Sequence, residues 1–81
     1  MTKTTLKING MMCGMCESHV NDAIRQAFAV KKVTSSHKDN ETVIISKEPL
    51  DEETIRTTIR DTGYDLVSIN SEPYEKKGLF S

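Results

Sequence analysis

The chain has 81 residues, of which 36% are hydrophobic and 28% are charged, so it fits one small domain with a single core. Eleven Lys and Arg stand against twelve Asp and Glu, and this balance lacks the basic excess that is typical of nucleic-acid binding. No apolar run approaches the roughly 20 residues of a membrane helix, and the polar start of the chain lacks the apolar stretch of a secretory signal. We therefore expect a cytoplasmic protein with no membrane insertion, whose thiols stay reduced.

The first part of the sequence predicts a strand, a loop and a helix. Residues 4–9 alternate polar and apolar side chains, which is typical of a strand with one buried face. Residues 10–15 contain two glycines and predict a loop. Cys16 then opens a helical pattern that ends around Ala29, with apolar residues at three- and four-residue spacing.

The second part of the sequence predicts a hairpin, a helix and a last strand. Residues 33–37 and 42–46 are strand candidates separated by four polar residues, and the second is rich in β-branched side chains. Asp51 is a good N-cap for a second helix, and Gly63 supplies its C-terminal stop. Residues 66–69 are apolar at three of four positions and predict the closing strand.

The predicted order of elements is β-α-β-β-α-β. This order is the split βαβ arrangement, a ferredoxin-like α+β sandwich with two helices on a four-stranded antiparallel sheet. We assign residues 1–70 to this domain. Residues 71–81 show no periodicity and contain Pro73 and Gly78, so we expect them to form a flexible C-terminal tail.

The two cysteines, Cys13 and Cys16, lie three residues apart between the first predicted strand and the first predicted helix. In a reducing compartment, such a pair indicates a metal or redox site, since a disulfide closing so short a loop would stabilise little. The partial positive charge and unpaired N–H groups of a helix N-terminus favour thiolates, which bind soft metals. The spacing alone leaves a metal site and a thiol–disulfide oxidoreductase open.

The small number of ligand residues favours Cu(I) over Zn(II). Zinc prefers four ligands, or three and a water, whereas Cu(I) accepts few. His19, one helical turn after Cys16, is a minor candidate for a third ligand, with a plain surface residue as the alternative, and His37 is interpreted as a strand or turn residue. Met12 and Met15 are either tolerated surface residues or an adaptable apolar rim for a partner. No catalytic triad, paired carboxylate site or phosphate-binding loop points to an enzyme.

Residues 10–16 read GMMCGMC, which resembles the GMxCxxC signature of the heavy-metal-associated domain family. That family includes bacterial copper chaperones and the cytosolic metal-binding domains of copper-transporting P-type ATPases. Gly63 and Tyr64, after the second predicted helix, also resemble the family. The likeness extends over about residues 3–70, nearly the whole chain.

The resemblance implies a role for each matching position. Cys13 and Cys16 would be the metal ligands, and Met11 would be a buried apolar support beneath the loop rather than a ligand. Tyr64 would lie near the site and help to shield or tune it. Met12 occupies a position where family members for zinc often have Asp, which argues against zinc, and where copper-type members more often have Thr or Ser.

The resemblance also implies a function, that of a cytosolic copper chaperone. Such a protein binds one Cu(I) through its two thiolates and passes it on by ligand exchange. The implied partner is a copper-transporting P-type ATPase or its metal-binding domain, or a copper-responsive repressor, and a metal-bridged homodimer is a further expectation. Three alternatives stay open: a metal-binding domain of such an ATPase, a carrier of Zn(II), Cd(II) or Hg(II), and a thiol–disulfide oxidoreductase.

Overall fold

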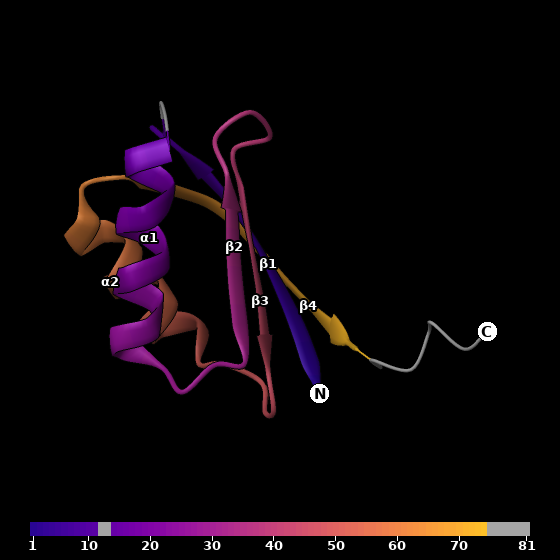
Figure 1. Ribbon diagram of the computed structural model, residues 1–81. Helices are drawn as coiled ribbons and strands as arrows, with labels where there is room; N and C mark the ends of the chain where they lie inside the picture. The colour runs from indigo at the N-terminus through magenta and orange to yellow at the C-terminus, as the bar shows by residue number, and fades with distance from the viewer. Residues whose placement is uncertain (12–13, 75–81) are drawn as a thin grey trace.

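The computed structural model describes residues 1–11 and 14–74. In chain order the elements are β1 (Thr2–Asn9), α1 (Gly14–Ala27), β2 (Lys32–Ser36), β3 (Glu41–Ser46), α2 (Glu52–Thr62) and β4 (Asp65–Pro73). The two helices lie side by side over one face of the sheet (Figure 1). Within these two ranges, no helix is both long enough and apolar enough to cross a membrane.

The four strands form one antiparallel sheet in the order β2-β3-β1-β4. In the central strand β1, Leu6 lies opposite Thr42 of β3 and Ile69 of β4. A bulge between Lys7 and Ile8 shifts the pairing of β1 with β4, and bulges of this kind bend a strand locally. The architecture is therefore the ferredoxin-like sandwich that the sequence predicts, and both the element order and the antiparallel pairing are confirmed.

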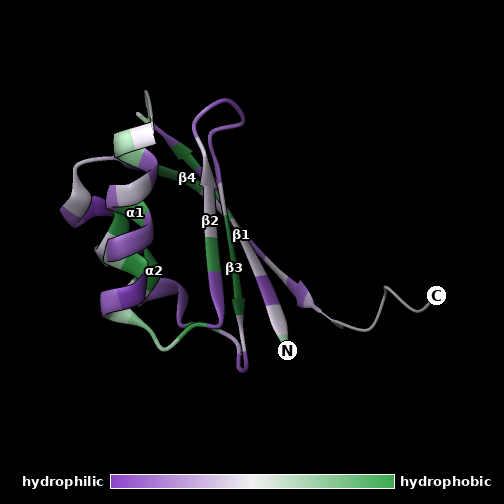
Figure 2. Ribbon diagram, in the orientation of Figure 1, coloured by the Kyte–Doolittle hydropathy of each residue, from purple (hydrophilic) through white to green (hydrophobic). Residues whose placement is uncertain are grey.

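The core lies between the helices and the sheet, where Figure 2 shows the hydrophobic residues concentrated. Alternate residues of β1 face it, and two residues of each helix are fully buried against them. The buried apolar cluster consists of Leu6, Ile8, Met11, Val20, Ile24, Val33, Ile44, Ile55 and Ile59. This packing joins the connection after β1 to α1, because Met11 in that connection and Val20 in the helix belong to one cluster.

Both ends of α2 have the capping groups that the sequence predicts. At its start, the backbone N–H and the hydroxyl of Thr54 donate to Oδ2 of Asp51 at 3.0 and 2.7 Å. The bond from the hydroxyl, and after it the bond from the backbone N–H, hold the pKa of Asp51 below its usual value. The cap therefore stabilises the fold at neutral pH, and this stabilisation is lost as the pH falls through the lowered pKa. At its end, Gly63 adopts φ +92° and its N–H donates to the carbonyl of Arg60. Tyr64 therefore follows directly from a fixed helix end.

Strand β4 runs three residues past residue 70, where the sequence placed the boundary between domain and tail. Strand β4 does not end at Ile69 but continues to Pro73, paired with the first residues of β1. The N–H of Tyr74 then donates to the carbonyl of Met1 at 2.9 Å. The start of the predicted tail thus belongs to the sheet, because β1 begins at Thr2 and offers backbone partners there. The rest of that tail, residues 75–81, lies outside the described residues.

A buried hydroxyl on the core face of β1 offers a test of this packing. Thr4 is fully buried, and its Oγ1 has no hydrogen-bond partner among the described residues. We expect Thr4→Val to raise the free energy of unfolding by about 1 kcal/mol, because it replaces an unsatisfied polar atom with a methyl group of similar size. Urea unfolding measures the change.

The neighbouring strand supplies the control for this prediction. Thr42 is equally buried, but its hydroxyl lies 2.9 Å from Oγ of Ser35. We expect Thr42→Val to lower the stability instead, because it leaves a hydrogen bond unmade. Equal losses of stability in both variants would contradict the claim that the Thr4 hydroxyl has no hydrogen-bond partner among the described residues.

Candidate metal centre

The cysteine pair lies at the junction of β1 and α1, and the structure describes one of its two members. Helix α1 begins at Gly14 rather than at Cys16, so Cys16 is its third residue and is half-buried. The predicted start was two residues late because glycine is a weak helix former and hid the first turn. Cys13 and Met12 lie outside the described residues.

The position of Cys16 favours its thiolate form. The first four N–H groups of an α-helix have no acceptor within the helix, and they carry the positive end of its dipole. Cys16 lies within that turn. A thiolate there is stabilised by the helix, which makes it a better ligand for a soft metal than a cysteine in the middle of a helix or strand.

Met11 lies immediately before the segment that the structure leaves undescribed. Its side chain is 4% exposed and belongs to the buried apolar cluster, together with Val20 and Ile24 of α1. A thioether in this position packs as a hydrophobic side chain, and its removal would leave a cavity next to the first turns of α1. This burial fits a support beneath the loop, the place that the sequence suggested for Met11.

Tyr64 lies against the start of the same loop. Gly10 adopts φ +105°, and a Cβ added there would lie 3.2 Å from Cδ1 of Tyr64. The ring of Tyr64 also meets the ring of His19 edge to face, with centroids 6.1 Å apart. Tyr64 thus bridges the residue that begins the GMxCxxC sequence and a residue one turn after Cys16.

The close approach at Gly10 leads to a prediction. We expect Gly10→Ala to lower the free energy of unfolding by about 1–3 kcal/mol, since alanine rarely adopts this φ and its methyl group would displace Tyr64. Gly63→Ala is the matched control, because Gly63 also has a positive φ but its added Cβ meets nothing within 4 Å.

Thermal unfolding of the two variants separates backbone strain from the contact with Tyr64. We expect the loss to be larger for Gly10→Ala, and we expect only that variant to change the ring signals of Tyr64 in NMR spectra. Equal losses with an unchanged Tyr64 environment would show that the contact at Gly10 does not matter.

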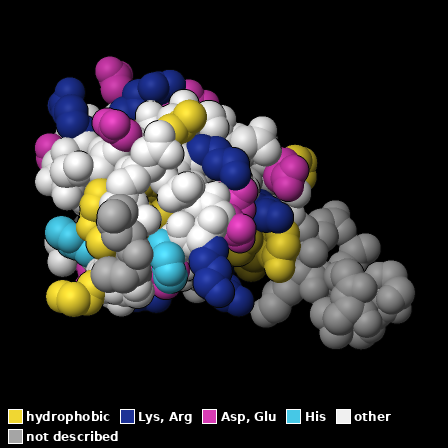
Figure 3. All heavy atoms as spheres, turned by 90° about the horizontal axis from the view of Figure 1, so that it is seen from above, with side chains coloured by type: hydrophobic (Ala, Val, Ile, Leu, Met, Phe, Trp, Pro, Cys, Tyr) yellow, Lys and Arg dark blue, Asp and Glu magenta, His cyan; other side chains and the backbone are white. Residues whose placement is uncertain are grey.

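The two histidines occupy different environments, and Figure 3 shows histidine side chains on the face seen from above. His19 is exposed on α1, where it contacts Tyr64, and its predicted role as a minor third ligand stays a prediction. His37 follows β2 in a turn, as expected, but it also binds Glu17 of α1. Its backbone N–H and its ring Nδ1 lie 2.7 and 2.6 Å from Oε2 of Glu17.

The pair of Glu17 and His37 is the feature of this site that the sequence did not reveal. The bond from the backbone N–H of His37, followed by the bond from its ring, holds the pKa of Glu17 below its usual value. Twenty residues separate the two in sequence, and neither a motif nor a periodicity joins them. Only the packing of α1 against β2 brings them together.

Among residues 1–11 and 14–74, no group of three His, Cys, Asp or Glu side chains is placed to hold an ion. Met15, next to Cys16, is 82% exposed. This exposure agrees both with a tolerated surface residue and with an apolar rim for a partner. A ligand set made of Cys13 and Cys16 alone would leave coordination positions open for an incoming ligand.

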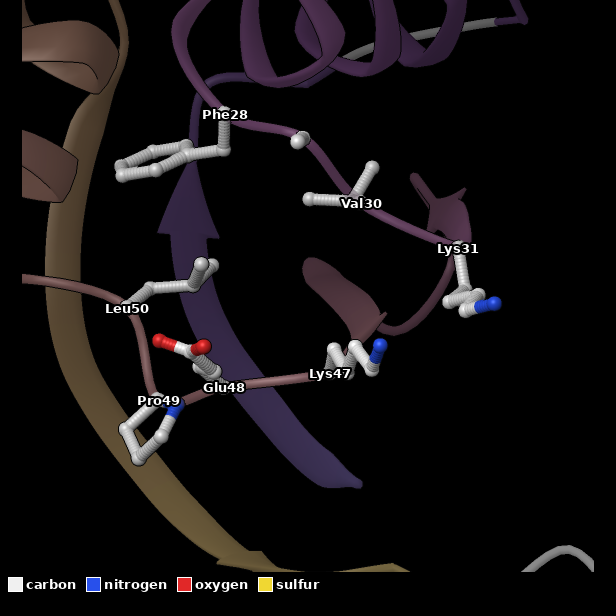
Figure 4. A pocket seen from close by; sticks show the side chains of 8 residues that line it. Phe28, Val30, Lys31, Lys47, Glu48, Pro49 and Leu50 are labelled. Carbon is white, nitrogen blue, oxygen red and sulfur yellow. The ribbon is translucent and has the colours of Figure 1, made fainter.

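A pocket among the described residues lies at the end of α1 opposite to Cys16. It is a hollow of about 620 Å³ beside the C-terminal end of α1 and the connection from β3 to α2. Its lining side chains include Phe28, Val30 and Leu50, with Lys31 and Lys47 at one side (Figure 4). Phe28 directly follows α1 and lies twelve residues after Cys16, a separation of roughly 18 Å along the helix axis. Among the described residues, neither Cys16 nor either histidine lines this pocket.

A ferredoxin-like sandwich with a cysteine pair between its first strand and first helix matches the class of small heavy-metal-binding domains. The sequence pattern of the heavy-metal-associated domain matches residues 5–65. The chain belongs to this family. No curated protein matches the sequence significantly.

Solved structures with the same fold include a domain in a Cu(I)-loaded state and another in a Zn(II) form. The metallochaperone CopZ is 24% identical, with a TM-score of 0.71 over 80% of this chain and 98% of CopZ. The yeast copper transporter domain Ccc2a, solved in apo and Cu(I)-loaded states, is 23% identical, with a TM-score of 0.72 over 93% of this chain and all of that domain. The apo N-terminal domain of ZntA is 24% identical, with a TM-score of 0.70 over 89% and 93% of the two chains. At these identities the likeness shows the fold.

Proposed function

We propose that this protein is a cytoplasmic copper chaperone that binds one Cu(I) through Cys13 and Cys16 and passes it to a partner by thiolate exchange. It would act as a carrier and not as an enzyme. The observation that carries the proposal is the position of Cys16 in the first turn of α1, within a CxxC sequence of a heavy-metal-associated domain.

The number of ligands supports Cu(I). A Zn(II) site needs four ligands, or three and a water, whereas two thiolates satisfy Cu(I). The described residues add no cluster of three further ligand side chains. Met12 supports the same choice, because it leaves out the carboxylate that zinc-type members of the family often have before the first cysteine.

The same site supports transfer of the metal. A Cu(I) held by two thiolates at the surface accepts a third thiolate from a partner before either original sulfur leaves, so no free ion forms. Met11 and Tyr64 hold the flanks of the loop in place, while the exposed Met15 offers an apolar contact that adapts to a partner's surface. The proposed partner is a copper-transporting P-type ATPase or its metal-binding domain, or a copper-responsive repressor, and two copies sharing one Cu(I) would form a metal-bridged dimer.

The likeness to both Ccc2a and ZntA makes the choice of metal the first point to test. The reduced protein is titrated without oxygen with Cu(I) and with Zn(II), each against a chelator of known affinity. We expect Cu(I) to be bound with a stoichiometry of one and to displace Zn(II) at the free-metal levels that the chelators set. Tighter binding of Zn(II) under these conditions would contradict the copper chaperone and favour a zinc carrier.

A second measurement separates the carrier from a thiol–disulfide oxidoreductase. The metal-free, reduced protein is mixed with a disulfide substrate and a reductant that regenerates its thiols. We expect no catalytic turnover beyond the rate of a simple dithiol at the same concentration. Turnover well above that rate would support the redox alternative.

A further inference from the structure

The first turn of α1 is tied to the end of β2 through one carboxylate. Glu17 is the residue after Cys16, and its Oε2 accepts hydrogen bonds from the backbone N–H and from Nδ1 of His37. An ionised carboxylate only accepts hydrogen bonds, so the ring carries its proton on Nδ1 when it is neutral. With side chains only 26% and 34% exposed, the two residues are partly shielded from solvent.

A second tether lies one helical turn further along α1. Oγ of Ser35 donates to Oδ1 of Asn21 at 2.6 Å, and the hydroxyl of Thr42 then donates to Ser35 at 2.9 Å. Glu17 and Asn21 are four residues apart, so they lie on the same face of α1. Their partners His37 and Ser35 are two residues apart and lie on the same side of the strand. Of the two tethers, the one between Glu17 and His37 is next to Cys16.

We propose that His37 is a positioning residue for the metal centre, which through Glu17 holds the first turn of α1 and the backbone that carries Cys16. The inference rests on the proposed function, since it concerns the same pair of sulfurs. It adds a residue that lies outside the CxxC segment and on the opposite side of the sheet-to-helix interface.

The need for such a tether follows from the position of Cys16. The first turn of a helix frays easily, because its N–H groups have no acceptors within the helix. A site with two ligands has no further protein ligand to correct a displaced sulfur, so the geometry depends on where the backbone lies. Displacements of about 1 Å are enough to weaken sites of this kind. Two hydrogen bonds to one carboxylate next to Cys16 restrict that displacement.

Three variants isolate the contribution of the ring. His37→Phe keeps an aromatic ring of similar size but removes the donor at Nδ1. His37→Asn restores an N–H donor at the corresponding position of the side chain. Ser35→Ala breaks the second tether and serves as the matched control, because it loosens the contact of α1 with β2 one turn away from Cys16.

Cu(I) affinity of the full chain, measured by competition with a chelator, is the first measurement. We expect His37→Phe to bind Cu(I) about 10-fold more weakly, which is the usual size of an effect from residues that orient ligands. His37→Asn should recover to within about 3-fold of the parent protein. Ser35→Ala should also stay within about 3-fold, even if it unfolds at a lower urea concentration.

Amide hydrogen exchange in the metal-free protein is the second measurement. In an α-helix the N–H of residue 20 bonds to the carbonyl of residue 16, so the Val20 amide reports opening of the turn that holds Cys16. We expect faster exchange of this amide in His37→Phe, and parent-like exchange in His37→Asn and Ser35→Ala.

The two measurements give outcomes that separate this inference from the proposed function. Unchanged Cu(I) affinity in His37→Phe, or an equal loss in Ser35→Ala, would overturn the positioning role, as would unchanged exchange at Val20. If the parent protein prefers Zn(II), the proposed function fails, and the same ranking of the variants with Zn(II) and in hydrogen exchange would still support the role of His37.

Discussion

Replacement of either cysteine by serine is expected to abolish useful Cu(I) binding. A serine hydroxyl is not deprotonated at neutral pH and is a hard donor, so Cys13→Ser and Cys16→Ser each leave a single thiolate. Structural zinc sites with four ligands are worth roughly 10–16 kcal/mol, or about 2.5–4 kcal/mol for each ligand. By that measure we expect a loss of Cu(I) affinity on the order of 100-fold in each variant. Anaerobic competition with a Cu(I) chelator measures it.

Met15→Ser is the matched control for this prediction. It introduces the same residue next to Cys16, at a side chain that is 82% exposed and packs against little. We expect it to keep Cu(I) affinity within about 3-fold of the parent protein, since no ligand is lost. If Cys16→Ser keeps native affinity, Cys16 is not a ligand, and the proposed two-thiolate site is wrong.

Truncation of Ile24 is expected to have the largest effect on stability. Ile24 is fully buried in α1 and belongs to the cluster that joins both helices to the sheet. Ile24→Ala should lower the free energy of unfolding by about 3–4 kcal/mol, because it removes buried methyl and methylene groups and leaves a cavity. That is a large part of the roughly 5–15 kcal/mol that stabilises a typical domain. Urea unfolding followed by circular dichroism measures the loss.

An exposed position on the same helix gives the comparison. Gln26 lies on the solvent side of α1, and Gln26→Ala should change the stability by less than about 0.5 kcal/mol. Similar losses in the two variants would mean that α1 does not pack through Ile24. Since the same packing holds the first turn of α1, we also expect Ile24→Ala to bind Cu(I) more weakly than Gln26→Ala does.

Local patterns were sufficient to predict most of the fold. The alternation in residues 4–9 identified the buried face of β1, and Asp51 and Gly63 marked the two ends of α2. These signals are local, because a strand face and a helix cap depend on neighbouring residues. The same holds for the start of the site, where the GMxCxxC sequence pointed to Met11 and Cys16 and the structure places both beside the β1–α1 junction.

The features that the sequence did not predict depend on tertiary contacts. Residues 70–73 have little strand propensity, yet they extend β4, because the backbone of β1 is available beside them. Pro73 is tolerated there because β4 is an edge strand. In the same way, nothing local marks His37 as a partner of Glu17, since the contact exists only once α1 packs on β2. Cys13 lies outside the described residues, so its role stays a prediction.

The transfer of Cu(I) to an acceptor tests the proposed carrier most directly. The Cu(I)-loaded protein is mixed rapidly with increasing concentrations of a dithiol acceptor, and the loss of the copper–thiolate absorption is followed. Exchange through a shared intermediate predicts a transfer rate that rises with the acceptor concentration and exceeds the rate of spontaneous Cu(I) loss. A rate that equals spontaneous loss and does not depend on the acceptor would contradict a carrier that hands its metal on by thiolate exchange.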